Sequence, residues 1–468
     1  MFESRYLNMT FVFYDTETTG TDVYFDQIVQ FGAIKTDDEL NELDRFEIRC
    51  KLMPHIVPSP TAMLVTSVTP SMLTDPSLPS YFEAMQLIYK KMKEWSPAIF
   101  FGYNSISFDE SLIRQAFYQT LQPIYLTNTS GNSRCDVMRM LHATHIFASN
   151  VIAVPINDKG KPSFKLDILA PANGFTHDNA HEAISDVEAT IYMTKLMKDR
   201  ASEVWKNMLN LKSKQDVKYF ISQNEVFVGA DIYFGEAHSW MLTPCGSNPN
   251  YKSEFAAFNL SFLPDDYINL SVDELIQMLN GKEKPIRTFK SNGQPILMPT
   301  GLIPENLTTK DLTQEKIARR AAQIRENIEF KKRVSLALAG RYKVMEPSPH
   351  VEEKIFDGFF SNIDTRLMAQ FQLGDWEEKL AVARQLEDPR LREIARRQIY
   401  FEQPDLLSKT VRKDLDGWIV NRLSIKETSV PWRTIPDAIA EADKLSGNTN
   451  LEGKASIGLV KEFILGLV

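Results

Sequence analysis

The sequence predicts an α/β domain with a mixed sheet, followed by a β-rich segment and then by a mostly helical one. In the first ~200 residues, short apolar runs alternate with longer runs whose apolar residues recur at helical spacing, a pattern typical of strands and helices that alternate along the chain. The 468 residues exceed what one hydrophobic core usually organises. We therefore expect three domains, at residues 1–200, 201–350 and 351–468.

The elements of the first domain follow from periodicity. TFVFYDTE is apolar and aromatic and QIVQFGAIKT alternates before it turns polar, so both are predicted to be strands, joined by the turn-like TTGTD. The helix that ends at Arg200 has basic residues in its last turn, where they favour the helix dipole. In order, the prediction is a strand at 10–17, a turn at 18–22, a strand at 27–36, a helix at 80–95, a strand at 98–104, and helices at 109–121 and 181–200.

The pattern changes after residue 200. Short β-like pieces separated by Pro, Gly and Asn predict a small barrel or sandwich, and a basic helix follows it. A Pro/Ser break near residue 347 predicts a domain boundary, beyond which helical periodicity dominates. The β-like pieces lie at 218–221, 225–234, 254–260 and 294–300, the basic helix at 313–338, and the later helices at 375–399 and 435–447.

Composition excludes several classes of protein. No apolar run approaches the ~20 residues that a membrane span needs, and the first ten residues lack the order of a secretory signal. The three cysteines, Cys50, Cys135 and Cys245, are far apart and have no metal-like spacing, which suits packed thiols in a reducing compartment. We expect a cytoplasmic protein with no membrane contact, and a monomer.

Charge is distributed unevenly along the chain. Between Lys282 and Lys343 there are 14 Lys and Arg against 6 Asp and Glu, a net charge of +8, which leaves −16 for the rest of a chain whose total is −8. A basic belt on an acidic protein indicates a polyanion that is bound at one place. The alternative is a solvated helix face, because the predicted helix in this stretch must expose some charge.

Asp15 and Glu17 end the first predicted strand. Side chains two residues apart on a strand leave from the same face, so the two carboxylates can point together. Two close carboxylates repel unless they are protonated or bridged by a cation, and Mg²⁺ takes oxygen ligands and commonly bridges to phosphates. The alternative is an ordinary solvated strand end, because Asp-x-Glu recurs elsewhere in the chain.

Further acids can join this pair. Asp109 opens a helix directly after the strand at 98–104, so it is either a first-turn acid favoured by the helix dipole or a third carboxylate at the same edge of the sheet. His181 and Asp186 lie five residues apart, about 140° around a helix, so they cannot share one face. Asp186 inside the helix could face a metal while His181 before its first turn takes a proton from water. The alternative for His181 is a packed or surface histidine.

Four motifs give these residues a context. They are YDTETTGT at 14–21, GYNSISFDE at 102–110, KPSFKLDILAPANGFTHDNAHEAISDVEATI at 161–191 and DGFFSNID at 357–364. The set resembles the DEDDh 3′→5′ exonucleases, and within them the bacterial exonuclease I family. The resemblance is dense from about residue 11 to 195 and weak beyond about residue 370. It implies an RNase H-like exonuclease domain, an SH3-like β domain and a C-terminal helical domain.

The resemblance also implies an activity. Asp15, Glu17, Asp109 and Asp186 would bind two Mg²⁺ ions, for which Mn²⁺ could substitute, and His181 would be the general base. The enzyme would be an exodeoxyribonuclease I that hydrolyses single-stranded DNA to 5′-mononucleotides in DNA repair and recombination. Its partners would be single-stranded DNA and the acidic tail of single-stranded DNA-binding protein. The implied substrate-binding residues are Thr18, Ser163, Phe164, Lys165, Lys331, Arg333 and Arg341.

Two rival functions remain open at this point. A DEDDh exoribonuclease or a proofreading exonuclease would need the same catalytic residues, because discrimination against RNA depends on contacts to the 2′-hydroxyl. The regions beyond residue 200 disfavour the short, single-domain versions. A non-catalytic scaffold that binds single strands is the other rival, and the presence of all five catalytic residue types argues against it.

Overall fold

The computed structural model describes residues 9–176, 182–303, 312–342, 346–426, 430–447 and 451–467. The chain forms two compact units. Unit 1 comprises Met1–Asn132, Asp178–Glu188 and Pro347–Val468, and unit 2 comprises Ser133–His177 and Ala189–Glu346. Unit 1 therefore combines segments from both ends of the sequence. The division into three domains that the sequence suggests stays a prediction.

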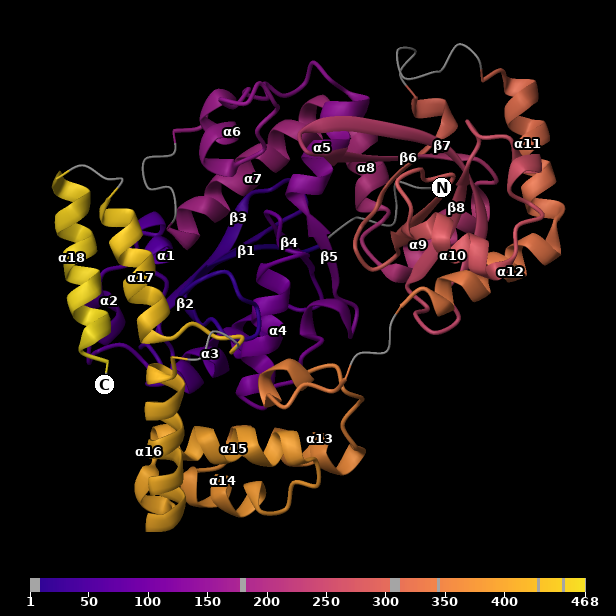
Figure 1. Ribbon diagram of the computed structural model, residues 1–468. Coiled ribbons are helices and arrows are strands. Elements are labelled where there is room, and N and C mark those ends of the chain that lie inside the picture. Colours follow the sequence, from indigo (N-terminus) through magenta and orange to yellow (C-terminus); the bar gives the residue numbers. More distant parts are fainter. Residues whose placement is uncertain are drawn as a thin grey trace. The chain divides into compact units, whose positions relative to one another are not determined.

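Four strands of unit 1 form a mixed sheet (Figure 1). They are β1 (Phe11–Thr18), β2 (Ile28–Thr36), β3 (Glu42–Arg49) and β4 (Ile99–Gly102), in the order β3-β2-β1-β4. β1 runs antiparallel to β2, with Asp15 opposite Gly32, and parallel to β4, with Phe13 opposite Phe101. This arrangement confirms the mixed sheet predicted for the first part of the chain.

Helices of unit 1 come from both ends of the sequence. Ser80 begins one of them with a capping box, in which its side chain accepts a hydrogen bond from the backbone of Glu83 and the Glu83 side chain accepts one in return. The N-terminal helices are α1 (Pro60–Val65), α2 (Pro70–Thr74), α3 (Tyr81–Glu94), α4 (Asp109–Gln119) and the 3₁₀ helix η2 (Leu126–Asn128). The C-terminal ones are η6 (Val351–Lys354), α13 (Asn362–Leu373), α14 (Trp376–Ala383), α15 (Pro389–Glu402), η7 (Pro404–Leu406), α16 (Lys409–Ser424), α17 (Ile435–Ser446) and α18 (Leu451–Leu465).

The main core of unit 1 lies between the sheet and helices from both ends of the chain. Tyr14 and Phe31 from the sheet, Phe82 from α3, and Phe371 and Ile394 from α13 and α15 are buried in the same cluster. The rings of Phe82 and Phe371 pack edge to face, with centroids 6.0 Å apart. Burying each such side chain contributes about 1.5–3 kcal/mol. The C-terminal helices thus complete the core on which the sheet rests.

A second core holds the last two helices against the N-terminal part of unit 1. Val29 of β2 and Met63 of α1 are buried together with Ala438 of α17 and Val460 of α18. α17 and α18 lie side by side (Figure 1). The end of the sequence is therefore packed against its beginning.

Unit 2 contains a five-stranded antiparallel sheet in the order β10-β6-β7-β8-β9. Its strands are β6 (Phe227–Tyr233), β7 (Glu236–Ser247), β8 (Glu254–Asn259), β9 (Ile286–Lys290) and β10 (Ile296–Pro299). Phe234 and Gly235 form the two-residue turn between β6 and β7, both with positive φ, as a tight hairpin requires. The other elements are the short strand β5 (Ser133–Asp136), α5 (Val137–Phe147), α6 (Leu166–Ala172), α8 (Ser202–Leu209), α9 (Lys214–Gln223), η3 (Pro264–Asp266), α10 (Val272–Asn280), η4 (Thr300–Leu302), α11 (Gln314–Glu326) and α12 (Ile328–Gly340).

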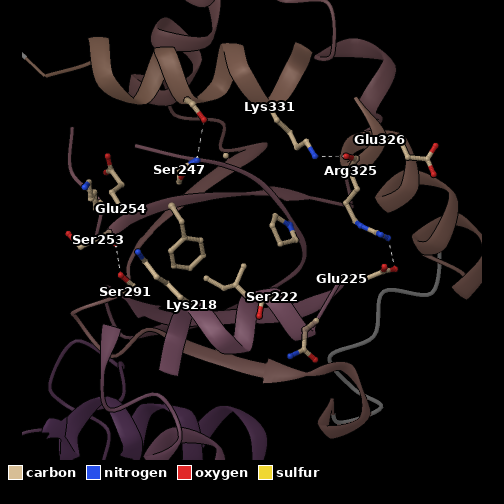
Figure 2. Close-up of a pocket in the computed structure, with 17 residues that line it drawn as sticks. Lys218, Ser222, Glu225, Ser247, Ser253, Glu254, Ser291, Arg325, Glu326 and Lys331 are labelled. Atoms are coloured by element: carbon tan, nitrogen blue, oxygen red, sulfur yellow. Dashed lines mark hydrogen bonds and ion pairs between the residues drawn. The ribbon is translucent and has the colours of Figure 1, made fainter. Parts of the chain in front are cut away.

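A cavity of about 730 Å³ lies in unit 2 (Figure 2). Side chains from α9, β7, β8, α11 and α12 line it. Four of them are basic, namely Lys218, Lys252, Arg325 and Lys331. Arg325 pairs with Glu225, and the Lys331 ammonium donates to the carbonyl oxygen of Arg325 at 2.6 Å. The basic belt of the sequence therefore contributes two cations, Arg325 and Lys331, to a pocket that is open to solvent.

Three predicted elements are corrected by the structure. The basic helix at 313–338 is two helices, because Asn327 accepts a hydrogen bond from the backbone of Phe330 and caps α12. The helix at 375–399 is also two, because Asp388 caps α15 and Pro389 occupies its first turn. Residues 218–221, predicted as β-like, lie within α9. Among the described residues, no helix is both long and apolar enough to cross a membrane.

Candidate active site

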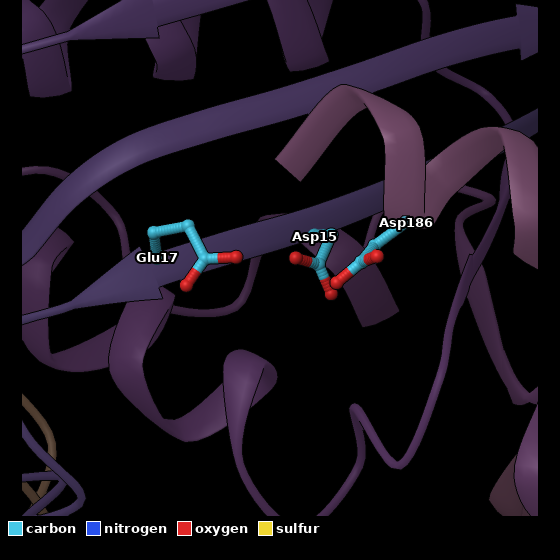
Figure 3. A group of neighbouring side chains, drawn as sticks. All are labelled: Asp15, Glu17 and Asp186. Atoms are coloured by element: carbon cyan, nitrogen blue, oxygen red, sulfur yellow. The ribbon is translucent and has the colours of Figure 1, made fainter. Parts of the chain in front are cut away.

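The site begins where β1 reaches the edge of its sheet. Asp15 and Glu17 are two residues apart on this strand, and their carboxylates share one region with that of Asp186 (Figure 3). One oxygen from each of the three acids can be chosen so that all lie within 4.8 Å of one another. Glu17 is 7% exposed, so this is not a solvated strand end. The structure therefore brings together three of the four acids that the sequence singles out.

Asp186 reaches the strand because a helix starts close to the sheet. It lies in the first turn of α7 (Ala183–Arg200). A Cβ atom at Gly32 would lie 2.8 Å from the backbone nitrogen of Ile184 and 2.9 Å from the carbonyl carbon of Ala183. Only glycine allows so close an approach without displacing the backbone. Because Gly32 is opposite Asp15 in the β1–β2 register, the helix delivers Asp186 next to that carboxylate.

Asp109, the fourth acid, is the first residue of α4 and is 4% exposed. The Thr16 hydroxyl donates a hydrogen bond of 2.6 Å to its Oδ1 atom. Asp109 is not one of the three acids within 4.8 Å, but its negative charge raises the pKa of Asp15 and Glu17. The structure thus places Asp109 in the electrostatic surroundings of the cluster, with its orientation fixed by a residue between the two β1 acids.

Glu110, which follows Asp109, is occupied by contacts that anchor α4. The Tyr14 hydroxyl donates to it at 3.3 Å and the Thr127 hydroxyl at 2.6 Å, and Arg114 forms an ion pair with it at 2.7 Å. These partners satisfy a carboxylate that is 1% exposed. Of two adjacent acids, Asp109 is thus the one whose charge acts on the cluster.

The electrostatics of the cluster are those of acids crowded away from water. Burial, and then the charges of Asp109, Asp186 and Glu17, raise the pKa of Asp15 well above its usual value. Burial, and then the charges of Asp186 and Asp109, raise the pKa of Glu17 to about 9, against the opposing effect of Arg49. Acids crowded in this way favour bound protons unless a cation replaces them. Clustered carboxylate oxygens suit a hard divalent cation such as Mg²⁺.

Arg49 was missed in the sequence, where β3 was not predicted as a strand. It is the last residue of β3, and its guanidinium lies 3.6 Å from the carboxylate of Glu182. Its positive charge lowers the pKa of Glu17, so it is a cation at the rim of the cluster. The segment ELDRFEIR is mostly charged, which gave no apolar run from which a strand could be inferred. His181, the predicted base, lies outside the described residues.

Thr18 is the predicted substrate-binding residue nearest to the cluster. It is 8% exposed, and its hydroxyl donates to the carbonyl oxygen of Gly20 at 2.6 Å. The hydroxyl therefore helps to shape the turn after β1. A contact of Thr18 with the terminal base stays a prediction.

The other predicted substrate-binding residues belong to unit 2. Ser163 and Phe164 are buried and Lys165 is exposed before α6. Lys331 lines the cavity described above. Arg333 donates to the carbonyl oxygens of Ile268 and Leu270, and Arg341 pairs with Glu254. Arg333 and Arg341 thus have protein partners, and a role of any of these residues in binding DNA stays a prediction.

Comparison with known proteins shows which proteins this chain is similar to. Residues 12–194 match the RNase_T family of exonucleases. Exodeoxyribonuclease I of Escherichia coli strain K12 is 28% identical over 377 residues, which cover 77% of this chain and 78% of the relative.

The fold is shared with solved structures. E. coli exonuclease I in complex with a dT13 oligonucleotide superposes with a TM-score of 0.86 at 23% identity, over 98% of this chain and 100% of that one. A structure of SSB/exonuclease I in complex with an inhibitor gives a TM-score of 0.83 at 23% identity, over 98% of this chain and 100% of that one. The chain is therefore similar in sequence to exodeoxyribonuclease I over 77% of its length, and its acidic cluster lies within the segment that matches the RNase_T exonucleases.

Proposed function

We propose that the protein is a Mg²⁺-dependent 3′→5′ exodeoxyribonuclease that removes 5′-mononucleotides from single-stranded DNA. The observation that carries the proposal is the convergence of Asp15, Glu17 and Asp186 from two elements into one group, in which Glu17 is buried and the other two are half-buried, within a segment that matches exonucleases. A scaffold that only binds nucleic acid has no need for three crowded carboxylates, because they repel a phosphate as well as one another.

Each residue of the candidate site has its own role in this proposal. Asp15, Glu17 and Asp186 would hold the divalent cations, and Asp109 would complete the set, with its carboxylate oriented by the Thr16 hydroxyl. When bound, two such cations activate the attacking water and neutralise the charge on the leaving oxygen. His181, which the resemblance implies as the general base, would take the proton of that water. The cation Arg49 offsets part of the acidic charge beside Glu17.

Single-stranded DNA is the proposed substrate because of the relatives. The E. coli relative is named an exodeoxyribonuclease, and its structure was determined with a dT13 oligonucleotide. The basic belt at 282–343 supplies the cations that a phosphate backbone needs. Repair and recombination, in which single-stranded ends are removed, are the cellular processes that we infer.

The test uses Asp186→Asn, with Asp199→Asn as its matched control. Asp199 is an exposed acid near the end of the same helix, where no catalytic role is expected. Oligonucleotides labelled at the 5′ end, as single-stranded DNA, RNA or duplex, are digested with Mg²⁺ or with EDTA. We expect a ladder from the 3′ end of single-stranded DNA that needs Mg²⁺, and a loss of more than about 100-fold in rate for Asp186→Asn alone.

Each other outcome selects a different function. Faster digestion of RNA would make the enzyme a DEDDh exoribonuclease. Equal rates for Asp186→Asn and Asp199→Asn would refute the assignment of the cluster. Binding of single-stranded DNA without digestion, whether with Mg²⁺ or with EDTA, would support the non-catalytic scaffold.

We further propose that the acidic carboxyl-terminal tail of single-stranded DNA-binding protein is the protein partner. One of the structures with this fold is an SSB/exonuclease I complex. The cavity of unit 2 supports this proposal, because Arg325, Lys218 and Lys252 line it together with apolar Ile221 and Phe255 (Figure 2). The arginine can bind the terminal carboxylate of the peptide, while the apolar side chains of the cavity pack against the peptide's last side chain.

Fluorescence anisotropy with a labelled acidic peptide that ends in a free carboxylate tests the partner site. Arg325→Glu should weaken binding by at least about tenfold, since losing a charge-assisted contact costs about 1.5–3 kcal/mol. Arg319→Glu, on the exposed side of the same helix α11, is the matched control. Equal affinity of the two variants would remove the cavity as the site.

A further inference from the structure

The loop between β1 and β2 is held by its own carboxylate. Asp26, which is 9% exposed, accepts hydrogen bonds from the Thr19 hydroxyl at 2.9 Å and from the backbone nitrogen of Asp22 at 2.8 Å. Thr19 also accepts a hydrogen bond from the backbone of Gln27 at 2.9 Å. A Cβ atom at Gly20 would lie only 2.4 Å from an oxygen of Asp26, so the loop closes tightly around this carboxylate. Its path starts two residues after Glu17.

The partners of this loop come from the far end of the sequence. Arg433 lies with its Nη1 atom 3.4 Å from Oδ1 of Asp26 and its Nε atom 3.5 Å from Oε2 of Glu441. Glu441, on α17, accepts hydrogen bonds from the Ser59 hydroxyl at 2.7 Å and from the backbone of Thr61 at 3.0 Å. All of these residues belong to unit 1.

These contacts form a closed circuit. The backbone nitrogen of Ser59 donates to the carbonyl oxygen of Thr19 at 2.7 Å. The circuit therefore runs through the five residues Thr19, Asp26, Arg433, Glu441 and Ser59, and we call it the Arg433 ring. Three of its members lie in the N-terminal part of unit 1 and two in the C-terminal part.

We propose that Arg433 is a positioning residue of the exonuclease site. Through Asp26 and Thr19 it fixes the backbone that leaves β1, and thereby the direction of Glu17. It touches none of the clustered acids. The proposal rests on the function proposed above, because the consequence that we infer is a tighter divalent-cation site and a faster reaction.

The geometry explains why a cation is placed there. A buried Asp26 without Arg433 would depend on neutral donors alone, and an uncompensated buried charge shifts toward its protonated form. A protonated carboxyl accepts fewer hydrogen bonds, so the Thr19 hydroxyl or the Asp22 backbone would lose its acceptor. The loop after β1 could then adopt other conformations, and Glu17 would move with it.

Mn²⁺ binding to the full chain, measured by titration calorimetry without DNA, tests the proposal apart from activity. Arg433→Met should weaken Mn²⁺ binding by about tenfold, the lower end of the effect of residues behind a metal ligand, and Arg433→Lys should restore part of it. Arg412→Met is the matched control, because Arg412 pairs with Asp405 on the surface among the C-terminal helices. In the nuclease assay, Arg433→Met should lower kcat more than it changes KM.

A second variant, at another position of the Arg433 ring, tests the same proposal if Arg433→Met is poorly folded. Thr19→Val opens the same ring at the loop, so combining it with Arg433→Met should weaken Mn²⁺ binding no further than the stronger single change. Additive effects would overturn the proposal, as would a lower Tm with Mn²⁺ affinity and kcat within twofold of the wild type. If the ring variants alter Mn²⁺ affinity but the wild-type protein has no nuclease activity, the proposed function is refuted and the positioning role stands.

Discussion

Asp15 and Glu17 stand close to Asp186 in a part of unit 1 that water reaches poorly, and this determines how they respond to pH. Burial and the neighbouring acids raise the pKa of Glu17 to about 9, above the value of about 4.5 expected in the unfolded chain. The folded state therefore binds more protons than the unfolded state between these values. The stability contributed by this group is full below pH 4.5 and is lost as the pH rises toward 9.

Divalent cations should reverse this trend, because they replace the protons and remove the repulsion. We expect the increase in Tm caused by Mg²⁺, relative to EDTA, to be larger at pH 8.5 than at pH 5. Taking the difference between the two conditions cancels groups that titrate far from the cluster. Differential scanning calorimetry of the wild type and of Glu17→Gln measures it. A Mg²⁺ effect that does not vary with pH in the wild type would contradict the prediction.

The sequence sufficed for some residues and not for others. Asp15 and Glu17 could be paired from the sequence because the side-chain period of a strand is two. The local sequence left Asp109 either as a first-turn acid or as a third carboxylate of the site, and only the structure distinguishes it from its neighbour Glu110. Their difference arises from Tyr14, Thr16 and other partners distant in sequence, which a local pattern cannot reveal.

Among the elements, the crossing of α7 over β2 matters most for the site. The helix starts within contact distance of Gly32, and its first turn carries Asp186. The helical pattern of residues 181–200 predicted the helix. It did not show that the helix would start against β2. That contact depends on the lack of a side chain at Gly32, and a single glycine forms no periodic pattern from which the contact could be predicted.

Gly32→Ala should therefore damage both stability and the cluster. The added Cβ meets backbone atoms of Ala183 and Ile184 at 2.9 and 2.8 Å, and overpacking of this kind costs about 1–3 kcal/mol. Urea unfolding gives the stability, and Mn²⁺ titration reports the displacement of Asp186. Gly417→Ala, inside α16 with open space around the new methyl group, is the control and should stabilise the helix by up to about 1 kcal/mol. Unaltered Mn²⁺ binding in Gly32→Ala would show that the crossing does not set the position of Asp186.

Other elements show where periodicity misleads. Apolar spacing continues across Asn327, so a single basic helix was predicted, but the Asn327 side chain ends one helix and caps the next. The aromatic and β-branched residues at 218–221 suggested a strand, yet they form part of α9, which Ser213 caps. Local hydrogen bonds of small polar side chains decided both cases, more strongly than hydrophobic pattern did.

At the scale of the whole molecule, unit 1 is joined by buried charges as well as by its cores. Glu352 is 4% exposed and accepts hydrogen bonds from Arg422 at 2.7 Å and from Arg397 at 3.0 Å. Arg422 also lies over the ring of Phe25 in the loop after β1, 5.3 Å from its centroid. Burial alone would raise the pKa of Glu352, but Arg422 and Arg397 hold it below its usual value.

Glu352→Gln should destabilise unit 1 strongly, because it removes the carboxylate that pairs with Arg422 and leaves Arg397 with Glu393 alone. Breaking a buried ion pair by removing one partner costs about 3–5 kcal/mol. The control is Glu377→Gln, an exposed acid of α14, which should change the free energy of unfolding by less than about 0.5 kcal/mol. Urea unfolding at pH 7 compares the two. Because the pKa of Glu352 is lowered, its contribution is present above pH 4.5 and is lost as the pH falls, so the difference between the variants should shrink in acid.

Contacts between residues far apart in the chain could not be predicted from the sequence. The mixed sheet could be predicted because alternation of strands and helices is a local property, and the family resemblance supplied the site. Asp26 and Arg433 are 407 residues apart, and neither belongs to a recognisable motif. Only the folded chain shows that its two ends share one core and one charged ring.

The shared core of unit 1 has a consequence for synthesis of the protein. Tyr14 and Phe31 need Phe371 and Ile394 to close the core around them, and Arg433 is translated later still. A ribosome that stops before the last hundred or so codons releases a polypeptide with every clustered acid but without the framework that aligns them. Such truncated polypeptides should then be inactive, and nuclease activity should appear only once translation is nearly complete.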